Sequence, residues 1–249
     1  MSLKTILTSC TLFLAVGLAD AQVVPVYGTV EKADFQQASE AFKRVRLLEQ
    51  IANGVNRTIR IPSRITLVAR ECGVVNAFYS PKDHSVHLCY ELLEQVVTGI
   101  AREFGSASSE AKMDSAFGAV FFILYHEMGH ALVDTLRLPV LGKEEDVADA
   151  IATYFMLRSR EPYPVVLGSL WFFGQGSHEF TLRQYADEHP VGPQRQYNLL
   201  CYAVGKDKAR FGPLSERFFL PPERAARCPT EYRNLETSVQ QLLGSYIRR

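Results

Sequence analysis

The sequence predicts one α+β domain in which a small antiparallel sheet precedes a series of helices. Its 249 residues suffice for one ordinary domain with a buried core, and 47% of them are apolar. Three β-like runs lie close together between residues 64 and 89. From Tyr90 onward the apolar residues recur at helical spacing, and no segment has the composition of an interdomain linker.

The first 21 residues predict a signal peptide rather than a part of the domain. Lys4 precedes an apolar run over residues 6–18, and Ala19-Asp20-Ala21 then supplies an A-x-A cleavage signal. The run is too short to span a bilayer comfortably, although an uncleaved N-terminal anchor is the alternative. We therefore expect residues 22–249 to form the single domain of an exported protein, periplasmic or secreted, without stable membrane insertion.

The first half of the domain is expected to be mixed. Apolar residues at helical spacing, ended by Asn53-Gly54, predict a helix. Short β-like runs then predict a strand and a hairpin with its turn at residues 80–83, after which the helical period returns. The expected elements are a helix over residues 36–53, strands over 64–70, 74–79 and 85–89, and a helix over 90–104.

The second half is expected to be helical. A Gly/Ser-rich loop at residues 105–109 precedes a long helix, and Pro139 and Gly142 mark the next loop. Acidic residues open the following helix, where the helix dipole favours them. Glu161-Pro162-Tyr163-Pro164 then interrupts the chain before an aromatic-rich segment around Trp171. The expected helices cover residues 110–134, 144–159 and 191–204.

The charge balance argues against two classes of partner. Lys plus Arg and Asp plus Glu number 27 each, so the formal net charge is zero, and no block of like charges is present. Such a balance gives no support to nucleic-acid binding and no strong attraction to an anionic membrane. We therefore expect no nucleic-acid partner.

The cysteines are expected to form disulfides. Removal of the signal peptide would leave four of them in an oxidising compartment, where three pairings are possible. The local pairing, Cys72–Cys89 and Cys201–Cys228, closes two loops of moderate length, each worth about 3 kcal/mol in the chain-entropy model. Zinc ligation by these four is the competing interpretation, but the chain contains no CxxC pair.

The segment His126-Glu127-Met128-Gly129-His130 indicates a metal site. Residues four apart lie on one face of a helix, so both imidazoles can reach one ion. A catalytic zinc site needs three protein ligands plus a water, and Glu127 can take a proton from that water, whose pKa zinc lowers to about 7. An amphipathic helix with two polar histidines is the alternative. The apolar run over residues 121–124 argues against it, because it predicts a buried helix in which these groups need partners.

The third ligand is not the one that metzincins use. Their motif continues to a glycine and a third histidine, but those positions hold Val133 and Leu136 here. The remaining candidate is a carboxylate on a following helix. Residues 144–149, just past the loop that contains Pro139 and Gly142, offer several.

A resemblance indicates which carboxylate that is. Glu145-Asp146-Val147-Ala148-Asp149 resembles the E-x-x-A-D segment of gluzincins. The resemblance implies that Glu145 is the third zinc ligand and that Asp149 supports a ligating histidine, where a carboxylate would fix the tautomer of the ring. Glu144 and Asp146 are neighbouring candidates, and a solvated acidic helix start is the alternative.

A second resemblance lies upstream of the metal motif. Asn76-Ala77-Phe78-Tyr79 is similar to the N-A-F-aromatic edge strand of thermolysin-like gluzincins, which pairs with extended peptide substrate. An edge strand suits this purpose because its free backbone groups can hydrogen-bond any sequence. The resemblance implies that Asn76 and Ala77 help to bind the substrate, whereas a buried hairpin strand would have a similar sequence.

A later polar segment, Asp187-Glu188-His189-Pro190, supplies a candidate for transition-state stabilisation. Gluzincin-type peptidases use a later His, Tyr or Arg to hold the oxyanion of the tetrahedral intermediate. His189 is the candidate, with Asp187 or Glu188 orienting its ring, and Arg195 is the alternative. A merely exposed loop histidine is the plain interpretation. No role is assigned to the remaining histidines, His84, His87 and His178.

Together these segments resemble one family. HEMGHALVD, GKEEDVADA, ADEHPVGPQRQYNLLC and the Cys72/Cys89 pair are similar to bacterial proteins classed as metallopeptidases with no established substrate. The resemblance covers residues 64–228 and implies a zincin-like fold of the minimal gluzincin kind, with the HExxH segment on an active-site helix.

The expected function is hydrolysis of peptide bonds with one Zn²⁺ ion, held by His126, His130 and Glu145, and with Glu127 as the base. The substrate would be a peptide or protein. The main alternative is an exported protein that binds zinc without catalysis and uses the cleft to hold a partner. A purely structural domain and a zinc hydrolase for other bonds are further alternatives, and the edge-strand resemblance argues against the last.

Overall fold

The structure, a computed structural model, describes residues 22–175 and 180–248. The expected signal peptide at residues 1–21 and His178 lie outside the described residues, so nothing about them is tested. Within the described residues, the buried apolar side chains of the sheet and of the helices belong to one hydrophobic cluster.

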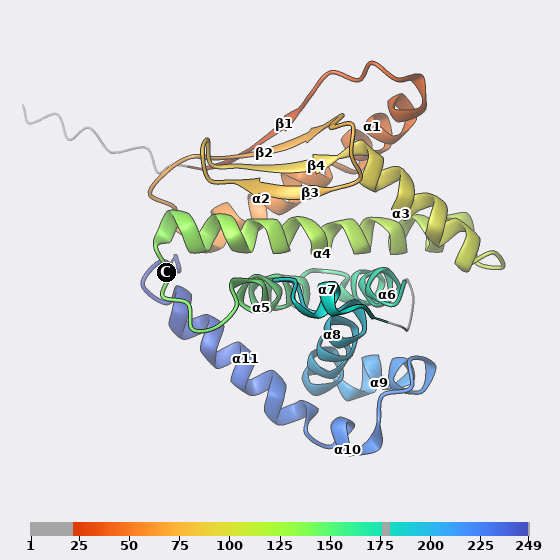
Figure 1. Ribbon diagram of the computed structural model, residues 1–249, viewed down its shortest axis with the longest axis vertical. Helices are drawn as coiled ribbons and strands as arrows, with labels where there is room; N and C mark the ends of the chain where they lie inside the picture. Colours follow the sequence, from red (N-terminus) through yellow and green to blue (C-terminus); the bar gives the residue numbers. More distant parts are fainter. Residues whose placement is uncertain (1–21, 176–179, 249) are drawn as a thin grey trace, which may run out of the picture.

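The long helix α4 (Ser109–Leu136) runs through the middle of the molecule. The sheet lies on one side of α4, and α5 (Glu144–Met156) and α6 (Pro162–Phe173) pack on the other (Figure 1). Ser108 caps the start of α4 by accepting a hydrogen bond from the backbone N–H of Ala111. The arrangement confirms an α+β fold and places the metal motif on a helix between two layers.

The sequence of α4 explains its central position. Apolar residues surround the helix rather than forming one stripe, which is the pattern of a helix packed on several sides. The helix is long and apolar enough to cross a bilayer, but 78% of its most apolar 18-residue window is buried inside the fold. Its hydrophobicity therefore serves the core.

The sheet has four strands in the order β1-β2-β4-β3. β1 pairs with β2 and β2 with β4 in parallel, whereas β3 and β4 form an antiparallel hairpin. β3 lies at one edge, which faces α4. The strands are β1 (Val23–Tyr27), β2 (Ile65–Arg70), β3 (Ala77–Ser80) and β4 (Ser85–Cys89).

The expectation of an antiparallel sheet is therefore wrong, since the sheet is mixed. The expected strands do not include β1, a short run containing Pro25 that follows the expected cleavage site. Two helices, α1 (Ala33–Val45) and α2 (Leu47–Thr58), carry the chain from β1 back to a parallel neighbour, as a crossover must. β3 also begins later than residue 74, because Gly73 adopts a left-handed conformation (φ 76°) and the chain bends there.

The helix expected over residues 36–53 is two helices. Arg46 adopts a left-handed conformation (φ 53°) that ends α1 and starts α2. α2 then continues through Gly54 to Thr58, although glycine inside a helix costs about 1 kcal/mol relative to alanine. A Cβ atom at Gly54 would collide with the hydroxyl oxygen of Tyr125 on α4, so a side chain here would require that ring to move.

The helices expected over residues 90–104, 110–134, 144–159 and 191–204 are present, whereas no expected range covers the helices at residues 162–173, 182–185 and beyond residue 207. Glu161-Pro162-Tyr163-Pro164 does not simply interrupt the chain, because Pro162 begins α6, where a missing N–H costs nothing. α3 (Tyr90–Glu103) agrees with its expected range within one residue. The other helices are α7 (Leu182–Tyr185), α8 (Gly192–Lys206), α9 (Lys208–Arg217), α10 (Pro222–Ala225) and α11 (Cys228–Leu243).

Close helix packing sets the distance between α4 and α5. Gly129, inside the metal motif, faces Ala148, and a Cβ atom at Gly129 would lie 2.8 Å from the Cα atom of Ala148. Glycine therefore lets the two backbones approach, and this approach brings the acidic start of α5 beside the histidines of α4.

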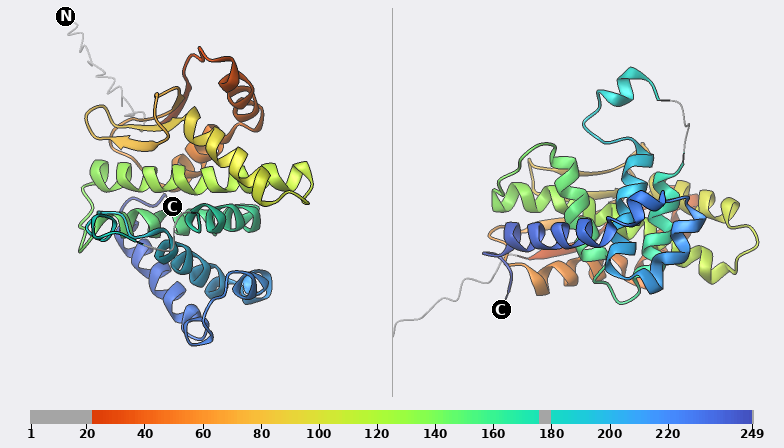
Figure 2. Two further views of the ribbon diagram at one scale, coloured as in Figure 1. Left: turned by 45° about the vertical axis from the view of Figure 1, so that its right-hand side comes forward. Right: turned by 90° about the horizontal axis from the view of Figure 1, so that it is seen from below.

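Two disulfides link neighbouring segments of the fold. Cys72 is joined to Cys89 at the end of β4, and Cys201 on α8 is joined to Cys228 at the start of α11. This is the local pairing expected from the sequence, and it fits an extracellular or periplasmic protein. The segment with α7 stands out from the body of the molecule (Figure 2).

Candidate metal centre and adjoining cavities

Two histidines on α4 form the centre of the site. His126 and His130 lie one turn apart, with their ring centroids 4.9 Å apart and their Nε2 atoms separated by 3.3 Å. The side chain of His126 is only 5% exposed and that of His130 is 16% exposed. Helical spacing alone thus brings both rings to one point.

Glu145 from the first turn of α5 completes a compact group. Its Oε2 atom lies 3.1 Å from His126 Nε2, and its Oε1 atom lies 3.2 Å from His130 Nε2. The side chain is 9% exposed. The structure therefore brings His126, His130 and Glu145 together, as the sequence predicts.

The outer nitrogens of the two rings each have a carboxylate partner. His126 Nδ1 lies 2.8 Å from Asp149 Oδ1, and His130 Nδ1 lies 2.7 Å from Glu144 Oε1. The contact of Asp149 agrees with its expected position. Glu144 was considered only as a competing ligand, and no spacing rule in the sequence separates it from its acidic neighbours.

Arg195 on α8 forms its closest contacts with Asp149 rather than with the histidines. Its Nε donates to Asp149 Oδ2 at 2.8 Å and its Nη2 to Oδ1 at 2.6 Å. Its guanidinium also stacks over the ring of Phe173 at 4.3 Å. These contacts fix the carboxylate that orients His126, so Arg195 acts on the site through Asp149.

The hydrogen-bonding pattern suits a bound cation. If each Nδ1–H donates to its carboxylate, both Nε2 atoms present lone pairs to each other at 3.3 Å. Glu145 Oε2 is buried and accepts no aligned hydrogen bond, although ring nitrogens lie within 3.3 Å of it. Lone pairs converging on one point need a positive charge between them, and two imidazoles plus a carboxylate are donors that zinc accepts.

The same contacts shift the ionisation of these groups. Burial raises the pKa of Glu145, but the adjacent rings of His126 and His130 outweigh it and hold that pKa well below its usual range. Burial lowers the pKa of His126, yet its contacts with Asp149 and Glu145 raise it overall. Burial raises the pKa of Glu127, although both imidazoles oppose this change. A raised pKa suits a carboxylate that must take and return a proton.

His189 approaches the group from the other side. Its Nε2 lies 3.3 Å from Glu145 Oε2, and its Nδ1 lies 2.9 Å from Asp187 Oδ1. Ligand atoms of His126, Glu145 and His189 all lie within 4.8 Å of one another, so by distance His189 could replace His130 as a donor. Its side chain is 50% exposed, however, whereas His130 is near both other donors. Glu188 has no contact with the ring among those described.

The remaining described histidines lie outside this group. His84 lies 2.8 Å from the hydroxyl of Tyr79, and His87 contacts Ser85 and Arg70. Neither was assigned a role from the sequence. His84 also lies 3.5 Å from Asp134 Oδ2 on α4, away from the group at His126.

The edge strand borders the site. The backbone N–H of Cys89 donates to the carbonyl of Asn76, so Asn76 faces β4, and by antiparallel alternation the backbone groups of Ala77 and Tyr79 face away from the sheet. The backbone N–H of Tyr79 opposes the rise in the pKa of Glu127. Ala77 therefore presents free backbone groups next to the metal motif, whereas only the side chain of Asn76 is available.

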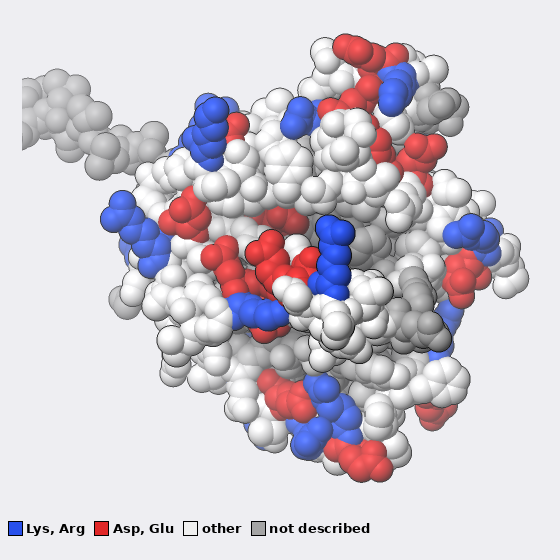
Figure 3. Space-filling model, in the orientation of Figure 1, with Lys and Arg blue, Asp and Glu red and all other residues white. Residues whose placement is uncertain are grey.

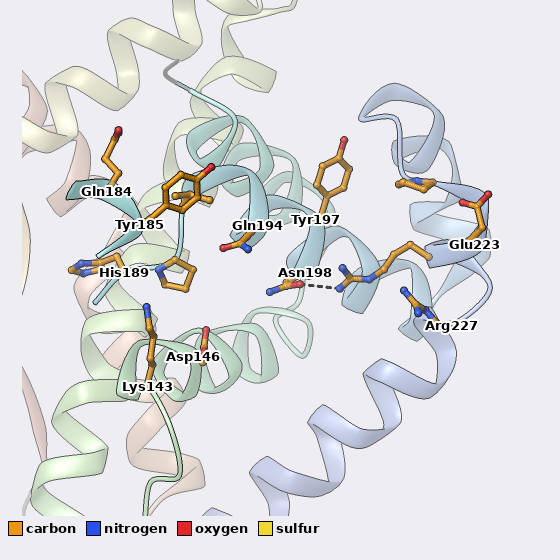
Figure 4. Close-up of a pocket in the computed structure, with 14 residues that line it drawn as sticks. Lys143, Asp146, Gln184, Tyr185, His189, Gln194, Tyr197, Asn198, Glu223 and Arg227 are labelled. Atoms are coloured by element: carbon orange, nitrogen blue, oxygen red, sulfur yellow. Dashed lines mark hydrogen bonds between the residues drawn. The ribbon is translucent and has the colours of Figure 1, made fainter. Parts of the chain in front are cut away.

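Two cavities meet at His189. One, of about 300 Å³, is lined by Asn76, Ala77, His126, Glu127 and His189, with apolar residues such as Phe173 behind them. The other, of about 700 Å³, has a lining of mixed polar and apolar residues. Figure 4 shows it between His189 and Tyr185 at one end and Arg227 at the other, with Asn198 hydrogen-bonded to Arg224 (2.8 Å).

The surface around the site is acidic. Figure 3 shows Asp and Glu side chains gathered at the centre of this face, with cationic side chains close by. Glu144 and Asp187 contribute exposed carboxylates there, with side chains 48% and 54% exposed. A concentration of carboxylates around two imidazoles attracts a cation.

The family comparison agrees with this geometry. Residues 27–243 match a family model described as "Putative metallopeptidase", and the chain therefore belongs to that family. The membership expected from the motifs is confirmed. No curated protein and no solved structure matches the chain. The family description names a class of activity without a substrate.

Proposed function

We propose that the protein is an exported zinc metallopeptidase that hydrolyses peptide bonds. The observation that supports this best is the convergence of two imidazole lone pairs and a buried carboxylate beside a second glutamate. His126, His130 and Glu145 would hold one zinc ion. A bound zinc ion polarises a carbonyl and lowers the pKa of a water molecule to about 7.

Glu127 is proposed as the general base. It follows His126 on α4 and lines the small cavity with Ala77, so a water in that cavity lies within its reach. Glu127 takes a proton from the attacking water and then delivers it to the leaving amine.

β3 is proposed to hold the substrate. Its outward backbone groups at Ala77 can pair with an extended peptide as an added strand, which binds any sequence. Asn76 contributes its side chain at the cavity wall. The apolar residues of that cavity would then accept one side chain of the peptide next to the cleaved bond.

His189 is proposed to stabilise the oxyanion. Asp187 accepts hydrogen bonds from both the backbone N–H and the Nδ1 side of His189, which leaves Nε2 directed at the metal centre. A charged ring donates from Nε2 to the negative oxygen of the tetrahedral intermediate. Arg195 is the weaker candidate because its Nε and Nη2 already donate to Asp149.

The test combines metal analysis with Glu127→Gln. We expect about one zinc per purified chain for wild type and variant, and a loss of about 10²–10⁴-fold in the rate of peptide-library cleavage for the variant. Glu94→Gln is the matched control, because Glu94 is exposed on α3. Protein without zinc would overturn the proposal.

The same experiment separates the main alternative. If wild type binds zinc but shows no peptide cleavage that depends on Glu127, the protein is a zinc-binding exported protein without catalysis at this site. Recovery of the mature protein beginning near Gln22 from outside the cytoplasm would support export. Recovery of the uncleaved chain in the cytoplasm would contradict it.

A further inference from the structure

A second, larger cavity lies on another face of α4. Phe117, Phe121 and Tyr125 line this groove of about 1130 Å³, while His126 and Glu127 line the cavity at the metal centre. Residues of α2, the end of α5 and the start of α6 form its other walls. The groove and the cavity at the metal centre have no lining residue in common, so the groove is a separate feature.

The walls of the groove are largely aromatic and aliphatic. Phe121 packs against Tyr125 with ring centroids 4.8 Å apart, and Tyr125 stacks on Phe155 at 5.0 Å. Phe117 and Leu167 extend this surface along α4 and α6. Its size and lining resemble those of small-molecule sites, which are mostly apolar with a few placed polar groups.

Two hydroxyl groups of the lining stand out because they have no partner in the described chain. Tyr125 is 3% exposed, and its hydroxyl has no hydrogen-bond partner within residues 22–175 and 180–248. Its oxygen lies against Gly54, where a side chain would clash. Ser159 Oγ, also in the lining, is buried without a partner among the described residues. A buried hydroxyl without a partner is costly, so Ser159 Oγ indicates that a group outside the described chain bonds to it.

Positive charge flanks these two hydroxyl groups. Arg57 follows Gly54 by one turn of α2, and no carboxylate of the described chain pairs with it. Arg158 follows Tyr154 by one turn and stacks over its ring at 3.8 Å, while pairing with Glu236. The end that holds Tyr125 therefore offers hydroxyl donors and an unneutralised guanidinium.

The carboxylates in the lining do not cancel this charge. Asp114 is on α4, eleven residues before Tyr125, which corresponds to roughly 16 Å along the helix. Glu161 already lies 3.4 Å from Arg210. The groove is thus positive and hydrogen-bonding at one end and apolar along its length.

We propose that this groove binds an amphiphilic carboxylate. Its carboxylate would accept hydrogen bonds from Tyr125, Ser159 and Arg57, and its apolar chain would lie along Phe117 and Phe121. An anion satisfies all the free donors at once, which neither a cation nor a neutral hydrocarbon does. The proposal concerns a ligand other than the peptide and does not depend on the metal.

The test is isothermal titration calorimetry of the mature protein with dodecanoate below its micellar concentration. We expect one saturable site per chain. Tyr125→Phe and Arg57→Gln should each weaken binding about tenfold, because each removes one donor to a charged group. Arg102→Gln, a change at an exposed arginine of α3, should leave the affinity unchanged. Dodecyltrimethylammonium, with the same chain and opposite charge, should bind at least tenfold more weakly.

Three results would overturn the proposal. They are no saturable binding of dodecanoate, equal binding of the cationic probe, or equal affinity in wild type and Arg57→Gln. Arg57 is exposed, so its variant should fold even if Tyr125→Phe does not, and circular dichroism checks both. Because neither zinc content nor peptide cleavage enters the readout, failure here is distinct from failure of the proposed peptidase function.

Discussion

Two walls enclose the candidate metal centre: the helical wall, with His126 and His130 on α4, and the loop wall, with His189. The histidines of the two walls differ strongly in burial. On the helical wall, the side chains of His126 and His130 are 5% and 16% exposed. On the opposite wall, His189 is 50% exposed. Each ring has a carboxylate at Nδ1, so the three histidines share one pattern of contacts in three environments.

The exposed fractions of the three carboxylates that contact these rings increase in the same order as those of the rings. Asp149 is 20% exposed and is itself bound by Arg195, Glu144 is 48% exposed, and Asp187 is 54% exposed. A ligand must be positioned before the ion arrives, which requires packing and further hydrogen bonds. We infer that the helical wall holds the metal and that the loop wall acts on the substrate.

The largest effect on zinc affinity is expected for His126→Ala. The buried ring contributes a ligand atom and leaves Glu145 and Asp149 without their shared partner. Affinity should fall by more than about a hundredfold, exceeding the usual effect of residues that only support a ligand. Competition with a chelator measures it, and His87→Ala on β4 is the control. Unchanged affinity would remove His126 from the metal site.

Asp149→Asn should have the next largest effect. Zinc affinity should fall by about a hundredfold, because the carboxylate orients His126. Loss of the charge also leaves Arg195 unpaired in a largely buried position, so the metal-free protein should lose about 3 kcal/mol of unfolding free energy in urea. A loss of affinity without a loss of stability would mean that the Asp149–Arg195 pair is not structural.

Glu144→Gln should have a smaller effect. The amide oxygen can still accept a hydrogen bond from His130 Nδ1. Because Glu144 is half exposed, water screens its charge, and removing that charge costs less. We expect about a tenfold fall in zinc affinity and a stability change within about 1 kcal/mol, measured as for Asp149→Asn. An effect as large as that of Asp149→Asn would contradict the idea that the more exposed carboxylate, Glu144, contributes less to metal binding than Asp149.

Short-range patterns predicted the helical wall because local rules determine it. The spacing of His126 and His130 brings their rings together on any helix, and family resemblance singled out Glu145 and Asp149. Glu144 was not assigned its role, since choosing among adjacent carboxylates depends on how α5 rotates against α4. That packing depends on Gly129 and Ala148, which no periodicity reveals.

Long-range pairing explains the errors in the fold. The direction of β1 and β2 is set by the crossover through α1 and α2, and hydrophobic alternation is the same in parallel and antiparallel strands. The break at Arg46 was missed because both helices share the helical period. The hairpin of β3 and β4, whose pairing is local, was predicted correctly in direction.

His189→Ala should leave zinc affinity unchanged within about twofold, the smallest effect of the series, because in the proposed site His130 rather than His189 is the third donor beside His126 and Glu145. Its effect should fall on kcat instead, with a loss of about 10²–10³-fold and little change in KM, as expected when a donor to the oxyanion is removed. The measurement pairs chelator competition with steady-state cleavage of one peptide. Arg183→Ala, at an exposed position of α7 in the same segment, controls for a general disturbance. A loss of zinc in His189→Ala together with retention in His130→Ala would exchange the roles of the two walls, and the loop would then hold the metal.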